Sequence, residues 1–161
     1  MLQTLPFLLV AGPLCIIAAV NDLKTMKIPN WISIVLFAVF LPLGLLLLPF
    51  DEFLWRLLAT VILFVIVFVM NAVGLIGGGD AKLAAAFTPY IATHDYGAFL
   101  FVMAVAGILT LAGHRIAGRI PVIRNATPDW KSWTAGNHFP YGLTICVTAI
   151  YYLIHRVMVV A

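Results

Sequence analysis

Asp22 and Asp80 are the two residues whose type and setting suggest chemistry. Asp22 follows a long apolar stretch, and Asp80 follows three consecutive glycines. An ionisable side chain at the edge of a hydrocarbon layer is costly unless it is paired or hydrated, so each is a candidate functional residue. Two carboxyl groups that share a proton can hydrolyse a peptide bond, because one accepts a proton from water while the other protonates the carbonyl oxygen. The pair predicts aspartic-protease chemistry, which requires no metal and no organic cofactor.

Both aspartates also have structural interpretations that stay open at this stage. Asp80 precedes a run of good helix formers and can be a helix N-cap. Asp22 ends an apolar helix, where an acid opposes the macrodipole, so an ion pair with Lys24 or Lys27 is its structural alternative. The same dipole argument makes Asp80 the expected base and Asp22 the expected acid of a catalytic pair.

Gly77, Gly78 and Gly79 precede the second acid. Without Cβ atoms they can bend the chain and let another backbone approach closely. An unwound glycine segment beside an acid can hold a substrate peptide extended by strand addition. A flexible turn between helices is the alternative, although such a turn needs only one glycine.

The composition places both acids in a membrane protein. Of the 161 residues, 64% are hydrophobic and 9% are charged, with a mean hydropathy of +1.12. A soluble domain carries about a quarter charged residues, so a water-soluble globule is excluded. The length suits one membrane domain over residues 1–161. No basic run interleaved with aromatics suggests a nucleic-acid partner, and Cys15 and Cys146 are expected to be small core residues.

The apolar runs predict an all-α, polytopic fold with about six membrane spans, because a spanning helix needs about 20 mainly apolar residues. The expected spans are residues 4–22, 30–49, 54–76, 81–93, 97–113 and 139–158. The fourth is short and contains Pro89, so we expect a short or broken crossing. Non-helical backbone at membrane depth is tolerated only where protein or a wet cavity covers it.

The distribution of Lys and Arg predicts the orientation. With the N-terminus outside, the inner connections are 23–29, 77–82 and 114–138. Seven of the nine basic residues lie there, namely Lys24, Lys27, Lys82, Arg115, Arg119, Arg124 and Lys131. The positive-inside rule therefore places both termini outside and both aspartates at the inner face. Segment 114–134, with its arginines and two tryptophans, is suited to lie along the inner membrane surface.

Three segments resemble the signatures of the type IV prepilin peptidases, which are membrane aspartic proteases with a GxGD motif. The run from Gly77 to Leu83 resembles that motif, the run from Asp22 to Asn30 resembles the first-acid region, and Pro140-Tyr141-Gly142 is a third match. The resemblance covers nearly the whole chain. It implies that Asp22 and Asp80 are catalytic. It also implies a substrate-binding role for Gly77, Gly78, Gly79, Lys82, Pro140, Tyr141 and Gly142.

The resemblance also implies a substrate and a location. Prepilins or pseudopilins would present a short basic leader and an apolar helix at the cytoplasmic face of the bacterial inner membrane, with membrane lipid and the pilus assembly machinery as further partners. Longer family members carry a cytoplasmic segment with paired CxxC motifs and also N-methylate the new terminus. This sequence has neither, so it resembles the short form of Flp or tight-adherence systems, and we expect no methyltransferase activity. Archaeal preflagellin peptidases share the fold and are the nearest alternative.

Two functions from other classes compete with a peptidase. Intramembrane acids and a glycine-interrupted span are also typical of a small ion-coupled transporter or channel. However, the sequence shows no repeated half-structure and no acid at mid-membrane depth. A structural subunit of a pilus assembly complex would leave the paired acids unexplained.

Overall fold

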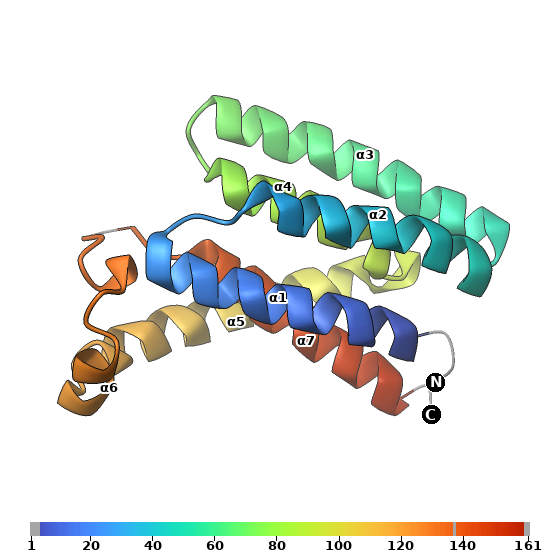
Figure 1. Ribbon diagram of the computed structural model, residues 1–161. Helices are drawn as coiled ribbons and strands as arrows, with labels where there is room; N and C mark the ends of the chain where they lie inside the picture. The colour runs from blue at the N-terminus through green and yellow to red at the C-terminus, as the bar shows by residue number, and fades with distance from the viewer. Residues whose placement is uncertain (1–3, 137, 160–161) are drawn as a thin grey trace.

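The computed structural model describes residues 4–136 and 138–159. In this part of the chain the secondary structure is helical, which confirms the all-α prediction. The helices are α1 (Leu5–Thr25), α2 (Asn30–Leu47), α3 (Phe50–Ala72), α4 (Gly78–Phe87), α5 (Tyr96–Ala117), α6 (Pro121–Ala126) and α7 (Tyr141–Val159), as Figure 1 shows. Three short 3₁₀ turns, η1 (Thr88–Tyr90), η2 (Thr93–Asp95) and η3 (Lys131–Trp133), join them.

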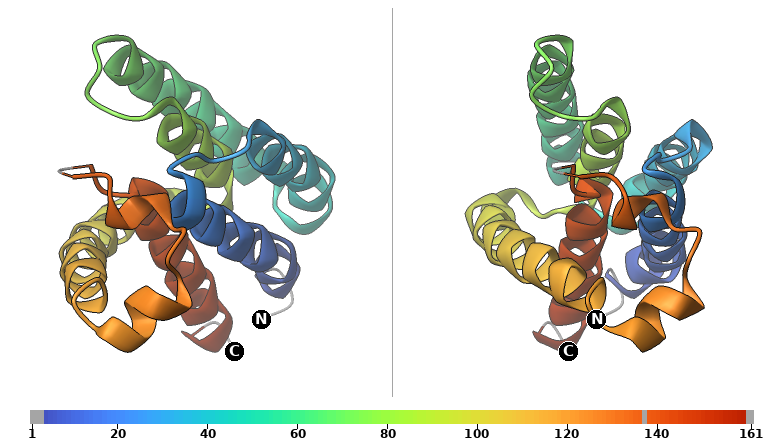
Figure 2. Two further views of the ribbon diagram at one scale, coloured as in Figure 1. Left: turned by 60° about the vertical axis from the view of Figure 1, so that its left-hand side comes forward. Right: turned by 90° about the vertical axis from the view of Figure 1, so that its left-hand side faces the viewer.

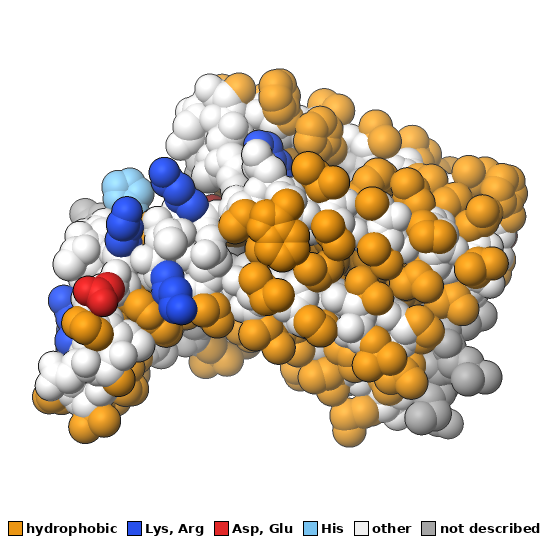
Figure 3. Space-filling model, in the orientation of Figure 1, with side chains coloured by type: hydrophobic (Ala, Val, Ile, Leu, Met, Phe, Trp, Pro, Cys, Tyr) orange, Lys and Arg blue, Asp and Glu red, His pale blue; other side chains and the backbone are white. Residues whose placement is uncertain are grey.

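Five of these helices are long and apolar enough to cross a membrane. They are α1, α2, α3, α5 and α7, and few of their side chains are buried inside the protein. The outward surface of α3 carries a dense row of apolar residues that includes Val61, Phe64 and Phe68. Figure 3 shows hydrophobic side chains over most of the visible face of the bundle. The chain is therefore a multi-pass membrane protein whose apolar surface faces lipid.

Local sequence explains where the first helices begin and end. Helix α1 ends at Thr25, and the C-cap residue Met26 adopts the left-handed conformation with a φ of 55°. Pro29 and Pro49 stand immediately before α2 and α3 with extended backbone. A proline costs no hydrogen bond at this position, because the first N–H groups of a helix have no partner within it. The short connections make α1, α2 and α3 successive crossings.

The bundle is built around the pair of α1 and α7. Small residues on the two helices, Ala11, Ala18, Cys15, Cys146 and Ala149, are buried between them and let the backbones approach closely. Both cysteines are free and buried, as expected for small core residues. Figure 2 shows α3 at one edge of the bundle and α5 at the other, with α1 and α7 between them.

The fourth crossing differs from a spanning helix, as its sequence predicted. Helix α4 has ten residues, which is about 15 Å of rise against about 30 Å of hydrocarbon. After Phe87 the chain continues through η1 and η2 to the start of α5. Residues 85–92 are all buried, so protein covers this non-helical backbone. The structure therefore has five long spans and one broken crossing, as the sequence predicted.

Arg56 supplies hydrogen-bond donors to backbone carbonyl groups of this broken crossing. Its guanidinium donates hydrogen bonds to the carbonyl oxygens of Pro89 at 3.3 Å and Tyr90 at 3.5 Å. It also bonds the Glu52 carboxylate at 2.8 Å, while only 7% of Arg56 is exposed. The Tyr90 hydroxyl donates to the Leu36 carbonyl at 2.7 Å. These contacts anchor the broken crossing to α2 and α3.

The connections divide between the two ends of the bundle. The start of α1 and the end of α7 lie at one end, and the α1–α2 connection, the α3–α4 turn and α6 lie at the other (Figure 1). This is the alternation expected from the basic residues, and it brings Asp22 and Asp80 to the same end.

Candidate active site

A cavity of about 330 Å³ opens at the end of the bundle where α1, α2 and α4 meet. Its lining consists of Asp22, Met26, Lys27, Ile28, Asn30, Gly77, Gly78, Gly79 and Asp80. Both predicted acids and the three glycines therefore lie around one space, although more than fifty residues separate them along the chain.

Asp22 lies on the last turn of α1 and is deeply buried. Only 5% of it is exposed, and its Oδ2 atom has no hydrogen-bond partner among the described residues. No ion pair with Lys24 or Lys27 forms, since the ion pairs of the described residues involve other acids. The structural alternative for Asp22 is therefore wrong, and no cation among the described residues pairs with this buried carboxyl group.

Asp80 lies in the first turn of α4 and does not cap it. The N-cap residue is Gly77, and no side chain makes a capping hydrogen bond there. The N-cap interpretation of Asp80 is therefore wrong. Burial raises the pKa of Asp80 to about 6, and the nearby backbone N–H of Gly142 opposes this increase in part.

Gly142, in the first turn of α7, connects the two carboxyl groups. Its backbone N–H lies near enough to Asp22 and Asp80 to act on both charges, and the two carboxyl groups also act on each other. A Cβ atom at this position would lie 2.7 Å from Asp22 Oδ2 and 2.6 Å from Ile28 Cδ1. Glycine is therefore what lets the start of α7 approach the acids.

The glycine run forms the start of α4, which corrects the expectation of an unwound segment. Gly78 and Gly79 are already helical, and only Gly77 has extended backbone. A Cβ atom on Gly77 would lie 2.7 Å from Asp80 Oδ2, and one on Gly79 would lie 3.2 Å from Ile28 Cβ. Two of the three glycines are thus needed for close approach within the site. The non-helical backbone between α3 and α4 is confined to residues 73–77, which are exposed except for the half-buried Ile76.

Polar side chains that the sequence gave no reason to select hold the loops of the site. Asn21 Nδ2 donates to the Lys27 carbonyl at 2.8 Å and fixes the connection after α1. Asn71 Nδ2 donates to the Ile76 carbonyl at 2.9 Å and closes the turn before α4. Gly74 has a φ of +77° in that turn. The position of each asparagine near the C-terminal end of an apolar helix is the one feature of the sequence that could have indicated these contacts.

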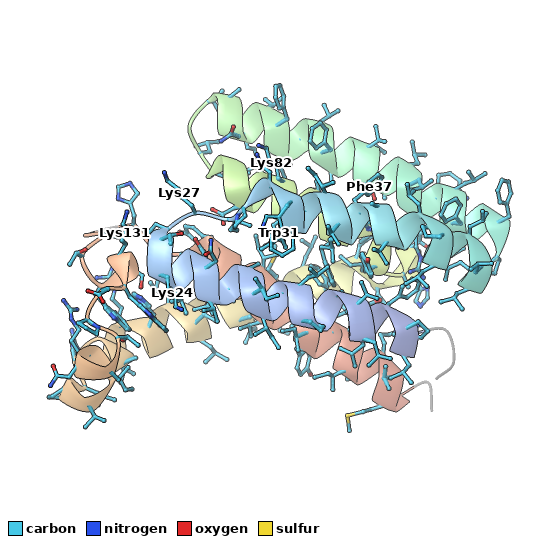
Figure 4. All side chains as sticks on the ribbon, in the orientation of Figure 1. Lys24, Lys27, Trp31, Phe37, Lys82 and Lys131 are labelled. Carbon is cyan, nitrogen blue, oxygen red and sulfur yellow. The ribbon has the colours of Figure 1, made fainter. Side chains whose placement is uncertain are left out.

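Lys82 contacts a residue of the cavity lining, whereas the 140–142 segment is not part of that lining. Lys82 Nζ donates to Asn30 Oδ1 at 3.0 Å, which ties α4 to α2 at the cavity rim. Figure 4 shows Lys24, Lys27, Lys82 and Lys131 at this end of the bundle. Pro140 and Gly142 are buried, whereas Tyr141 is 61% exposed, and none of the three lines the cavity.

The comparison with protein families decides what kind of protein carries this site. Residues 9–112 match the model of the type IV leader peptidase family. The chain belongs to the type IV leader peptidase family. The matched region holds Asp22, the glycine run and Asp80, and it ends before Pro140. Searches of curated proteins and of solved structures gave no match.

Family membership makes this multi-pass membrane protein a protease that processes the leaders of prepilin-like substrates. In this leader peptidase, two carboxyl groups, those of Asp22 and Asp80, lie beside one open cavity. The first backbone N–H groups of α7 supply positive potential next to these carboxyl groups.

Proposed function

We propose that this leader peptidase is an aspartic endopeptidase in which Asp22 and Asp80 are the catalytic residues. The observation that carries the proposal is that two carboxyl groups from α1 and α4 face one cavity, with no cation paired to either among the described residues. A protein does not gain stability from burying unpaired acids, so their retention supports a functional role.

The proposed reaction is an acid–base hydrolysis. Asp80, the more accessible acid, takes a proton from water as the water oxygen bonds to the scissile carbonyl carbon. Asp22 gives its proton to the carbonyl oxygen, which forms a tetrahedral diol. The C–N bond then breaks as Asp80 protonates the leaving nitrogen and Asp22 recovers a proton from a diol hydroxyl. One shared proton suits the pair, because burying one charge costs less than burying two.

We assign substrate contacts to the rim of the cavity. The exposed backbone at Gly77 is suited to pair with an extended peptide, and Gly78 and Gly79 keep side chains out of its path. Lys82 lies at the same rim, bonded to Asn30. Tyr141 is the exposed member of the 140–142 segment and can contact substrate, whereas the buried Pro140 and Gly142 support the acids from behind.

The proposed substrate is a Flp-like prepilin or pseudopilin in the bacterial inner membrane, cut at the cytoplasmic face. Seven of the nine Lys and Arg residues belong to segments at the cavity end, which supports a cytoplasmic cavity. We also propose that the protein lacks methyltransferase activity. Its two cysteines are buried between spanning helices and form no CxxC pair.

The test is incubation of the purified protein in lipid vesicles with a Flp-type prepilin and S-adenosylmethionine, followed by mass spectrometry. We expect loss of the leader and a product with an unmethylated N-terminus. An intact precursor would reject the peptidase assignment. A product heavier by one methyl group would reject only the absence of methyl transfer.

A further inference from the structure

The connection between α5 and α7 contains a preorganised element, which we call the α6 loop (residues 118–136). The Trp133 ring stacks on His114 at a centroid distance of 4.6 Å and on Trp130 at 5.8 Å. Its Nε1 donates to the Thr127 carbonyl at 2.9 Å. The Arg124 guanidinium lies 5.7 Å from the Trp133 ring centroid. These contacts give the α6 loop a defined shape.

The outer surface of this loop is apolar and uncovered. Helix α6 has no buried residue, and Val122 is 78% exposed. Ile120 and Ile123 beside it are exposed as well. Exposed large apolar side chains that cluster outside the spans indicate an interaction surface. Figure 2 shows α6 projecting from the body of the bundle, in agreement with the exposure of these three residues.

Basic residues accompany the apolar ones. Arg115 and Arg119 are exposed, and neither forms an ion pair with a described residue. Arg124 extends this basic group, and the loop has Asp129 as its only acid. A short segment that combines exposed aliphatic side chains with arginines has the chemistry of an element that lies in an anionic membrane surface.

The position of α6 decides between a lipid surface and a distant partner. Val122 is five residues beyond Ala117, the last residue of the spanning helix α5. Five residues reach at most about 18 Å, so Val122 cannot move far from the headgroup layer into which α5 emerges. The nearest surface that matches its charge is therefore the membrane itself.

We propose that the α6 loop, together with Arg115 in the last turn of α5, binds anionic phospholipid in the leaflet at the cavity end of the protein. Ile120, Val122 and Ile123 enter between the headgroups, and Arg115 and Arg119 bind their phosphates. The loop packs against α1 through η3, whose Ser132 is buried. Lipid binding thus holds η3 beside the helix that carries Asp22. This inference does not rest on the proposed catalytic mechanism.

The test measures membrane insertion of the full chain in nanodiscs. A spin label is attached at Val122→Cys. The native cysteines are buried, so the label attaches selectively at position 122. Its accessibility to a water-soluble nickel chelate is compared between discs of phosphatidylcholine and discs with about 30% phosphatidylglycerol. A label at Thr134→Cys, an exposed position in the same loop and outside α6, is the control.

We expect the Val122 label to lose several-fold of its nickel accessibility in the anionic discs, with little change at Thr134. The double variant Arg115→Gln/Arg119→Gln should abolish the difference between the two lipids. Equal nickel accessibility of the Val122 label in both lipids would overturn the proposal. So would an anionic effect that survives loss of both arginines. No peptidase activity enters this measurement, so its failure would leave the proposed function untouched.

Discussion

Replacement of Gly142 by alanine tests whether α7 positions the acids. The added Cβ would lie 2.7 Å from Asp22 Oδ2, and ordinary contacts begin at 3.4 Å. The Asp22 carboxyl group must therefore move by about 0.7 Å or rotate out of its site. The second contact, 2.6 Å from Ile28 Cδ1, involves the end of a flexible side chain that can adopt another rotamer.

The structure gives the size of the expected effect. A misplacement of about 1 Å in a catalytic group can cost about 10²-fold in rate, so we expect Gly142→Ala to lower kcat by one to two orders of magnitude. Crowding costs about 1–3 kcal/mol of stability, and the better helix propensity of alanine offsets up to about 1 kcal/mol of it. The protein should therefore remain folded while activity falls.

Gly97→Ala is a matched control. Gly97 also follows a tyrosine in the first turn of a helix, α5, and an added Cβ there meets nothing within 4 Å. Both variants are assayed for prepilin cleavage in vesicles and for thermal unfolding. Adding Ile28→Val to Gly142→Ala relieves only the second contact and should not restore cleavage. Wild-type kcat in Gly142→Ala, or full rescue by Ile28→Val, would refute the positioning of Asp22 by Gly142.

The remaining predictions concern stability. Because burial raises the pKa of Asp80 from 3.8 to about 6, the folded protein loses stability as pH rises through this range. At pH 7 the free energy of unfolding of Asp80→Asn should therefore exceed that of wild type by about 1–3 kcal/mol, and its melting temperature should be higher. Below pH 4 the two proteins should melt at the same temperature. Equal melting curves at pH 7 would contradict this. Arg56→Met should destabilise the fold by about 1–3 kcal/mol, since it leaves two buried carbonyls without their donor, while Glu52 keeps its hydrogen bonds from Thr93. An unchanged melting temperature would show that the broken crossing needs no anchor. Tyr90→Phe should cost about 1 kcal/mol in the same assay, through loss of its bond to Leu36, and a larger loss would indicate repacking.

Much of the fold follows from hydropathy, because spanning helices require long apolar runs. The five long spans, the weak fourth crossing at Pro89 and the meeting of Asp22 and Asp80 at one end could all be expected. Helix ends were displaced by a few residues, since local caps such as the left-handed Met26 override hydropathy there.

The details of the site depend on tertiary contacts that no local pattern encodes. The glycine run suggested unwound backbone, but its residues are needed because Asp80 and Ile28 approach them closely in the folded protein. Arg56 is one of the two basic residues outside the predicted inner connections, yet it is buried and donates hydrogen bonds to the backbone of a segment more than thirty residues away. Gly142 could not be linked to Asp22 before α1 and α7 were seen to pack together.

The central claim, that Asp22 and Asp80 cleave the leader, is tested most directly by replacing each with asparagine. Asp51→Asn, at an exposed acid in the first turn of α3, is the matched control. Cleavage of a Flp-type prepilin in vesicles is followed by mass spectrometry, with thermal unfolding to confirm that each variant folds. We predict that wild type and Asp51→Asn release the leader, whereas Asp22→Asn and Asp80→Asn each lose at least about 10²-fold in rate. A folded Asp22→Asn or Asp80→Asn variant that cleaves at the wild-type rate would contradict the account.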